Sequence, residues 1–292
     1  MADPRQRHPK NAPGPWFVDR TCIDCDVSRQ CAPWMFGAAD GQAVVVRQPA
    51  TEDQVRDATR ALLACPTASI GVVGEKPTTD GLLPDPIEGG VFYCGYSSKD
   101  SFGASAYLVE RAEGNLLVDS PRYVPPLVRD FEARGGLKLI LLTHRDDVAD
   151  ADQYAERFGA RVVIHEDDRR AAPYATDLLA GSGPTELRPG LVAFPVPGHT
   201  KGSVVYLLED RFLFTGDSLY FSRRRQRLSA FRDATWYSWE EQARSLARLG
   251  DLRFEWVLPG HGNRAKSRSE DWRRQLGELV EWMQAAPAAS DW

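Results

Sequence analysis

Four short segments, each with a histidine or an aspartate beside a glycine or threonine, constrain the fold of this chain most. Each follows an apolar stretch typical of a β-strand: Thr143-His144-Arg145-Asp146, Pro197-Gly198-His199-Thr200, Thr215-Gly216-Asp217-Ser218 and Pro259-Gly260-His261-Gly262. Imidazoles and carboxylates at strand ends can project into one cleft, and glycine lets the backbone approach closely. The pattern predicts a polar site assembled from four distant parts of the chain.

The chain around these segments reads as α/β. Short apolar runs punctuated by Gly, Pro and Asp predict strands at 104–109, 115–118, 138–142, 161–164, 191–194, 204–208 and 211–214. Amphipathic stretches predict helices at 150–158, 239–249 and 270–283.

Order, spacing and local sequence together resemble the metallo-β-lactamase superfamily over roughly residues 91 to 265. The match is most specific at Pro197–Ser203 and Phe214–Ser218. This resemblance implies an αββα sandwich with a metal site at one edge.

The first metal-binding motif of that family departs from its usual form, His-x-His-x-Asp-His. His144 is present, Asp146 stands where the second histidine belongs, and Val148 and Ala149 replace the Asp-His pair. Asp150 replaces the missing aspartate only if the loop carries a two-residue insertion.

The chain has too few histidines for the family's ordinary five-histidine dinuclear site. They are His8, His144, His165, His199 and His261. We expect His8 to lie in a tail and His165 to be structural, so the intact set is His144, His199 and Asp217. Two histidines and one carboxylate are typical of non-haem Fe(II) centres, and the persulfide dioxygenases of this superfamily are similar in using one iron held by a comparable triad. Zinc with a bound water is the alternative.

Two roles are open for His261. It is either a ligand of a second metal, together with Asp146, Asp150 and a bridging Asp217, or an acid–base group beside the open metal positions. In both readings His261 and Asp217 belong to the catalytic site.

Four of the five cysteines lie in the first quarter of the chain: Cys22, Cys25, Cys31 and Cys65. Such clustering in a reducing compartment favours metal or cluster binding over disulfides. Cys22-Ile23-Asp24-Cys25 and the distant Cys65-Pro66 resemble single-cluster ferredoxins, in which Cys-x2-Cys-x2-Cys and a Cys-Pro supply four thiolates. The resemblance implies a 4Fe–4S cluster.

The third cysteine of that pattern is displaced. Ser28 occupies its position, and Cys31 lies three residues further on. Three outcomes follow: Cys31 is the fourth ligand, which we favour; Ser28 or water serves there; or the site holds a 3Fe–4S cluster. A zinc ion on the thiolates and four structural cysteines are the alternatives to a cluster.

The expected organisation is therefore a disordered tail at 1–15, a small α+β ferredoxin-like domain at 16–70, a linker at 71–90 and a metallo-β-lactamase-fold catalytic domain at 91–292. The net charge of −5 shows no basic surplus and argues against nucleic acid and anionic membrane as partners. The polar N-terminus has no signal-peptide core, so a cytoplasmic protein is expected.

A mononuclear iron that activates oxygen gains from an electron-transfer domain on the same chain. The sequence therefore favours an oxygenase or oxidase acting on a small molecule, with an external reductase or ferredoxin as electron donor. A zinc hydrolase of an ester, lactone or thioester with a structural or regulatory cluster is the alternative, and a non-catalytic redox sensor is the third. The sequence identifies neither the substrate nor the oligomeric state.

Overall fold

The computed structural model describes residues 2–285. Two compact units divide the chain: one combines Met1–Leu137 with Ala149–Tyr154, and the other combines Lys138–Val148 with Ala155–Trp292. Helix α4 (Ala151–Phe158) begins in the first unit and ends in the second.

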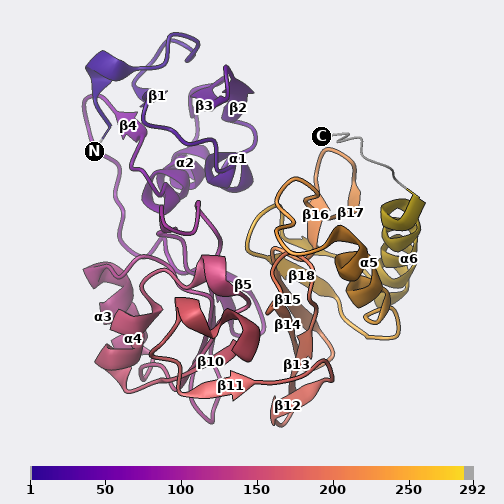
Figure 1. The fold of residues 1–292 in the computed structure, drawn as a ribbon. Helices are drawn as coiled ribbons and strands as arrows, with labels where there is room; N and C mark the ends of the chain where they lie inside the picture. The colour runs from indigo at the N-terminus through magenta and orange to yellow at the C-terminus, as the bar shows by residue number, and fades with distance from the viewer. Residues whose placement is uncertain (1, 286–292) are drawn as a thin grey trace. The chain divides into compact units, whose positions relative to one another are not determined.

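The first unit holds the cysteines. Its elements, most of them labelled in Figure 1, are η1 (Pro4–Gln6), β1 (Trp16–Val18), α1 (Val27–Cys31), β2 (Phe36–Ala39), β3 (Gln42–Val45), α2 (Glu52–Ala64), β4 (Ile70–Val72), β5 (Asp85–Glu88), β6 (Val91–Tyr93), β7 (Tyr107–Val109), β8 (Leu116–Val118) and α3 (Pro125–Ala133).

Strands β1 and β4 close the cysteine-rich region, because they pair antiparallel from Trp16↔Val72 to Val18↔Ile70. Helix α2 lies between them in the chain and starts at Thr51, whose side chain accepts a hydrogen bond from the Gln54 N–H. Apolar side chains from β1, β3, β4 and α2 form one core there. Strand β3 and helix α2 thus give this region the mixed α and β content expected of it.

Residues 2–15 are not a disordered tail, which corrects that expectation. The His8 N–H donates to the Val18 carbonyl at 2.9 Å, and the Ala12 N–H donates to the Val45 carbonyl at 2.7 Å. The His8 side chain is buried. These bonds tie the segment to β1 and β3, because backbone groups near a strand must find partners.

Part of the expected linker also has regular structure. Strand β5 pairs antiparallel with β6. The neighbouring strands of this sheet in the first unit therefore have the order β8-β7-β6-β5. Helix α3 follows β8 and was not predicted from the sequence. It begins with Pro125 and Pro126. Proline suits the first turn of a helix because N–H groups there have no intrahelical acceptor, so the missing N–H costs no hydrogen bond.

The second unit holds the four polar segments. Its elements are β9 (Leu139–Leu141), η2 (Arg145–Asp147), β10 (Arg161–His165), η3 (Glu166–Ala171), β11 (Asp177–Leu179), β12 (Thr185–Arg188), β13 (Leu191–Pro195), β14 (Val204–Leu208), β15 (Phe212–Gly216), β16 (Tyr220–Ser222), β17 (Arg227–Ser229), α5 (Trp239–Ala247), β18 (Trp256–Pro259), β19 (Ala265–Lys266) and α6 (Ser269–Ala285).

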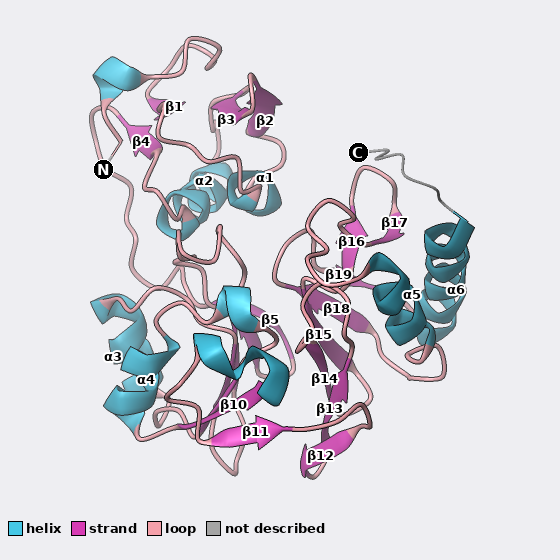
Figure 2. Cartoon of the chain, in the orientation of Figure 1, coloured by secondary structure: helices cyan, strands magenta, loops and turns pink. Residues whose placement is uncertain are grey.

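A six-stranded sheet in the order β12-β13-β14-β15-β18-β19 organises this unit. Strand β14 is antiparallel to β13 and β15, and β18 is parallel to β15, so β13, β15 and β18 run in one direction. Helices α5 and α6 lie side by side against the sheet (Figure 2), and their apolar faces share one core with β14, β15 and β18. The carboxyl ends of β13, β15 and β18 therefore meet at one edge.

No helix within residues 2–285 combines the length and the apolar character needed to cross a membrane.

Candidate metal centres

His199 lies in the loop between β13 and β14. The Val196 N–H donates to the Ser203 carbonyl at 2.7 Å and closes this loop. Gly198 is required beside it, because a Cβ there would lie 2.5 Å from the Cα of Gln242. The loop thus holds His199 at the edge where β13 ends.

Asp217 and His261 follow β15 and β18, whose parallel course brings both side chains to that edge. His261 Nε2 lies 3.8 Å from Asp217 Oδ2. Gly260 leaves space for the carboxylates, since a Cβ there would lie 2.7 Å from oxygens of both Asp147 and Asp217.

His144 follows β9 and is oriented by its neighbours. The Val204 N–H donates to the Thr143 carbonyl at 2.8 Å, and Thr143 Oγ1 lies 3.0 Å from His144 Nδ1. Because Nδ1 is engaged, Nε2 is the atom that faces the site, 3.7 Å from Asp217 Oδ2.

The three residues expected to bind the metal are brought together. Ligand atoms of His144, His199 and Asp217 all lie within 4.8 Å of one another, and the two imidazole centroids are 4.6 Å apart. The buried Nε2 atoms and Asp217 Oδ1 find no hydrogen-bond partner among residues 2–285. Buried polar atoms without partners are costly, and a bound cation removes that cost, so these residues fit a metal ion.

Asp146 joins this set. Its Oδ2 lies 3.3 Å from Nε2 of His199 and 3.9 Å from Nε2 of His144. Asp146 therefore places a second carboxylate between the two imidazoles.

Asp147, which the sequence did not single out, forms a second set with Asp217 and His261. Asp150, which was expected there, instead accepts a hydrogen bond from the Tyr123 N–H at 2.7 Å. Both sets contain Asp217, so its carboxylate could bridge two ions. The sequence feature that could have indicated Asp147 is its spacing of three residues from His144, which matches one turn of the 3-10 helix η2.

Burial and neighbouring charges tune these groups. Burial lowers the pKa of His144 to about 4, which keeps its imidazole neutral and able to bind metal. Burial also opposes protonation of His199, but the carboxylates of Asp146 and Asp217 outweigh it and leave the pKa of His199 raised. Burial disfavours the charged form of Asp217, yet the imidazoles of His261, His144 and His199 keep its pKa low.

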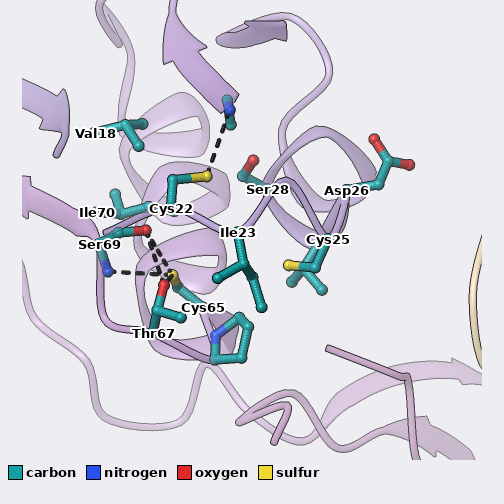
Figure 3. A pocket seen from close by; sticks show the side chains of 13 residues that line it. Val18, Cys22, Ile23, Cys25, Asp26, Ser28, Cys65, Thr67, Ser69 and Ile70 are labelled. Atoms are coloured by element: carbon teal, nitrogen blue, oxygen red, sulfur yellow. Dashed lines mark hydrogen bonds between the residues drawn. The ribbon is translucent and has the colours of Figure 1, made fainter. Parts of the chain in front are cut away.

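In the first unit, three cysteines surround one pocket. Figure 3 shows Cys22, Cys25 and Cys65 there together with Ser28; Cys31 is not among the thirteen residues that line it. Cys31 ends helix α1 and packs against the apolar core of the cysteine-rich region.

The sulfur atoms of this pocket fit a cluster. Cys22 Sγ accepts the Ala43 N–H at 3.4 Å, and Cys65 Sγ accepts the Ser69 N–H at 3.3 Å. Such bonds stabilise thiolates. Burial raises the pKa of Cys25 to about 12, so the buried thiolate needs a bound cationic partner.

A single zinc ion fits this pocket poorly. Among residues 2–285, the sets with three ligand atoms within 4.8 Å of one another are the two in the second unit. Cys22, Cys25 and Cys65 do not form such a set in the part of the chain that the structure describes. A cluster, whose thiolates attach to different irons, accepts wider spacing.

Comparison with known proteins decides the family. Residues 92–282 match the profile of the metallo-β-lactamase superfamily. The chain belongs to the metallo-β-lactamase superfamily. Residues 18–72 match the 4Fe-4S single cluster domain of Ferredoxin I.

Several proteins are similar to this superfamily member. A hydroxyacylglutathione hydrolase of Acidiphilium cryptum is 35% identical over 119 residues, 39% of this chain and 49% of that protein. A second one, of Shewanella pealeana, is 29% identical over 54% of this chain and 56% of its own length. This chain therefore spans about half the length of the curated relatives it matches.

Solved metallo-β-lactamase structures share the fold. The mono-zinc form of FIM-1 from Pseudomonas aeruginosa aligns with a TM-score of 0.52 at 19% identity, covering 69% of this chain and 95% of that one. The enzyme from Hirschia baltica aligns with a TM-score of 0.52 at 16% identity over 70% and 98%. The expected fold class is confirmed: a metallo-β-lactamase αββα sandwich preceded by a small ferredoxin-type domain.

Proposed function

We propose that this metallo-β-lactamase superfamily protein is an iron-dependent oxidoreductase of the oxygenase or oxidase type, with electrons arriving through the cluster of its ferredoxin-type domain. The observation that carries the proposal is the buried set of His144, His199 and Asp217 on the same chain as a single-cluster domain. A tethered cluster presents electrons at high effective concentration.

The donor set favours iron over zinc at this site. Two imidazoles suit either metal, but the carboxylates of Asp217 and Asp146 add hard oxygen donors. Bound there, non-haem iron supplies the one-electron chemistry that reduction of dioxygen requires. His144 Nε2, His199 Nε2 and Asp217 would hold it.

His261 is the group best placed to move protons. Its Nε2 lies 3.8 Å from Asp217 Oδ2, and its side chain is partly open to solvent at 16% exposure. In a monooxygenation, dioxygen, substrate, two electrons and two protons yield hydroxylated product and one water. His261 would deliver the protons, and an external reductase or ferredoxin would supply the electrons through the cluster.

A metal-dependent hydrolase is the second candidate, and two observations favour it. Two of the curated relatives are hydroxyacylglutathione hydrolases. Asp147, Asp217 and His261 could also hold a second ion next to the first. Paired metals activate water for attack on an ester or thioester. In that case the cluster would be structural or regulatory.

Anaerobic quantification of metal and sulfide separates the two candidates. The oxidoreductase should contain about five irons per chain, or about six if both sets in the second unit are filled. Zinc in the second unit beside cluster iron would favour the hydrolase.

A kinetic experiment then tests the redox role. The protein is reduced with dithionite, freed of reductant and mixed with air-saturated buffer, and cluster reoxidation is followed by absorbance. We expect His199→Ala to slow reoxidation and to lose the metal of the second unit. His165→Asn is the matched control, because His165 is equally buried but its Nε2 bonds to the Gly181 carbonyl. Equal reoxidation rates in the wild type and His199→Ala would contradict the proposal.

A further inference from the structure

The pocket of the ferredoxin-type domain offers three thiols and one hydroxyl. Cys22, Cys25, Cys65 and Ser28 line it, and Cys31 does not (Figure 3). The Ser28 side chain is buried, with 8% of its surface exposed. A hydroxyl therefore stands where a fourth thiolate would be expected.

The local backbone explains this placement. Asp24 and Asp26 both adopt positive φ, 58° and 68°, which turns the chain sharply between Cys25 and α1. Arg29 pairs with both carboxylates and holds the turn. Helix α1 then begins immediately, so Ser28 falls in its first turn, at the pocket.

Cys31 does not line the pocket. It lies three residues beyond Ser28, about 4.5 Å further along a helix axis. Its neighbour Ala32 is fully buried. The Ala32 N–H donates to the Ser28 carbonyl at 2.9 Å, which fixes the backbone of α1 between the two residues.

We propose that Ser28, and not Cys31, stands at the fourth corner of the cluster, so that three cysteines and a serine hydroxyl bind it and its fourth iron is exchangeable. This inference rests on the cluster assigned under the proposed function. An oxygen donor is harder than thiolate and holds cluster iron less firmly. With a one-electron oxidant such as ferricyanide, a 4Fe–4S cluster in its 2+ state would lose one electron and release Fe²⁺ from that corner. A 3Fe–4S cluster with charge 1+ would remain.

The test combines iron and sulfide analysis with EPR on the anaerobically reconstituted full chain. After ferricyanide treatment, the wild type should lose about one of its four cluster irons and show the EPR signal of an oxidised 3Fe–4S cluster. Ser28→Cys should retain all cluster iron and lack that signal. Cys31→Ala should behave as the wild type does.

A second measurement needs no variant. Oxidised wild-type protein is reduced in the presence of ⁵⁷Fe²⁺ and examined by Mössbauer spectroscopy, which should show label at one cluster site. Label at no site or spread over all sites would overturn the assignment, as would an iron content that depends on Cys31 and is unaffected by Ser28→Cys. Absence of sulfide from the wild type would overturn the proposed function as well, which distinguishes the two failures.

Discussion

The hydroxyl of Thr200 donates a hydrogen bond to Oδ2 of Asp168 at 2.5 Å. The same oxygen accepts the Arg145 N–H at 3.0 Å. Thr200 follows His199 and Arg145 follows His144, so one buried carboxylate ties together the two loops that carry the imidazoles. Asp168 touches neither imidazole and acts by positioning both.

Asp168→Ala should weaken metal binding in the second unit. Loss of the carboxylate removes the acceptor of the Arg145 N–H and one of two partners of the Thr200 hydroxyl, which also lies 2.9 Å from Ser203 Oγ. Loss of such supporting bonds costs about 10- to 100-fold in metal affinity. Chelator competition measures this. Asp167→Ala is the control, because its carboxylate pairs with the exposed Lys201 at 2.7 Å; equal affinities in the two variants would contradict the positioning role.

Gly260→Ala should disrupt both metal sets while leaving the fold intact. The added Cβ would come within 2.7 Å of carboxylate oxygens of Asp147 and Asp217, so at least one carboxylate must move. We expect reduced metal content and little change in thermal stability. The matched control is Gly277→Ala on α6, where a Cβ meets open space and helix propensity should add about 1 kcal/mol of stability. Full metal content in Gly260→Ala would rule out the crowding argument.

Arg122→Gln should lower the reduction potential of the cluster. The Arg122 guanidinium donates to the carbonyls of Cys65 at 3.3 Å and Ser97 at 3.0 Å, so it places a positive charge beside a cluster ligand and links that ligand's loop to the segment before β7. A cation stabilises the more negative reduced state, and its removal shifts the potential downward. Redox titration followed by EPR measures the shift. Arg56→Gln removes an equal but exposed charge from α2 and should leave the potential unchanged; an upward shift in Arg122→Gln would refute the argument.

Trp236→Phe should abolish most of the fluorescence quenching that accompanies Co²⁺ binding in the second unit. The Trp236 ring is 60% exposed and lies 6.2 Å from the His199 ring, centroid to centroid. Quenching by a bound metal falls steeply with distance, so this tryptophan should report occupancy most strongly. Fluorescence titration with Co²⁺ provides the measurement, and Trp282→Phe on α6 is the control. Undiminished quenching in Trp236→Phe would place the bound ion away from His199.

The sequence by itself indicated the family and predicted both metal-binding regions, including the set of His144, His199 and Asp217 whose ligand atoms the structure brings together. These follow from local patterns: apolar strands, the glycines that end them and the ligand types placed after them. A residue that follows a strand lies at the carboxyl end of that strand whatever the rest of the fold is. Strands β15 and β18 are parallel, so the residues after them lie at the same edge of the sheet.

Only the tertiary structure distinguished Asp147 from Asp150 and Ser28 from Cys31. An extended reading of the first motif places alternate residues on one face, but η2 is a 3-10 turn with about three residues per turn. Asp147 therefore returns to the side of His144, while Asp150 bonds to Tyr123. In the cysteine-rich region, left-handed residues before a one-turn helix decide which side chain reaches the pocket. Residue spacing alone does not show which side chain faces a site, because that depends on backbone angles that tertiary packing selects.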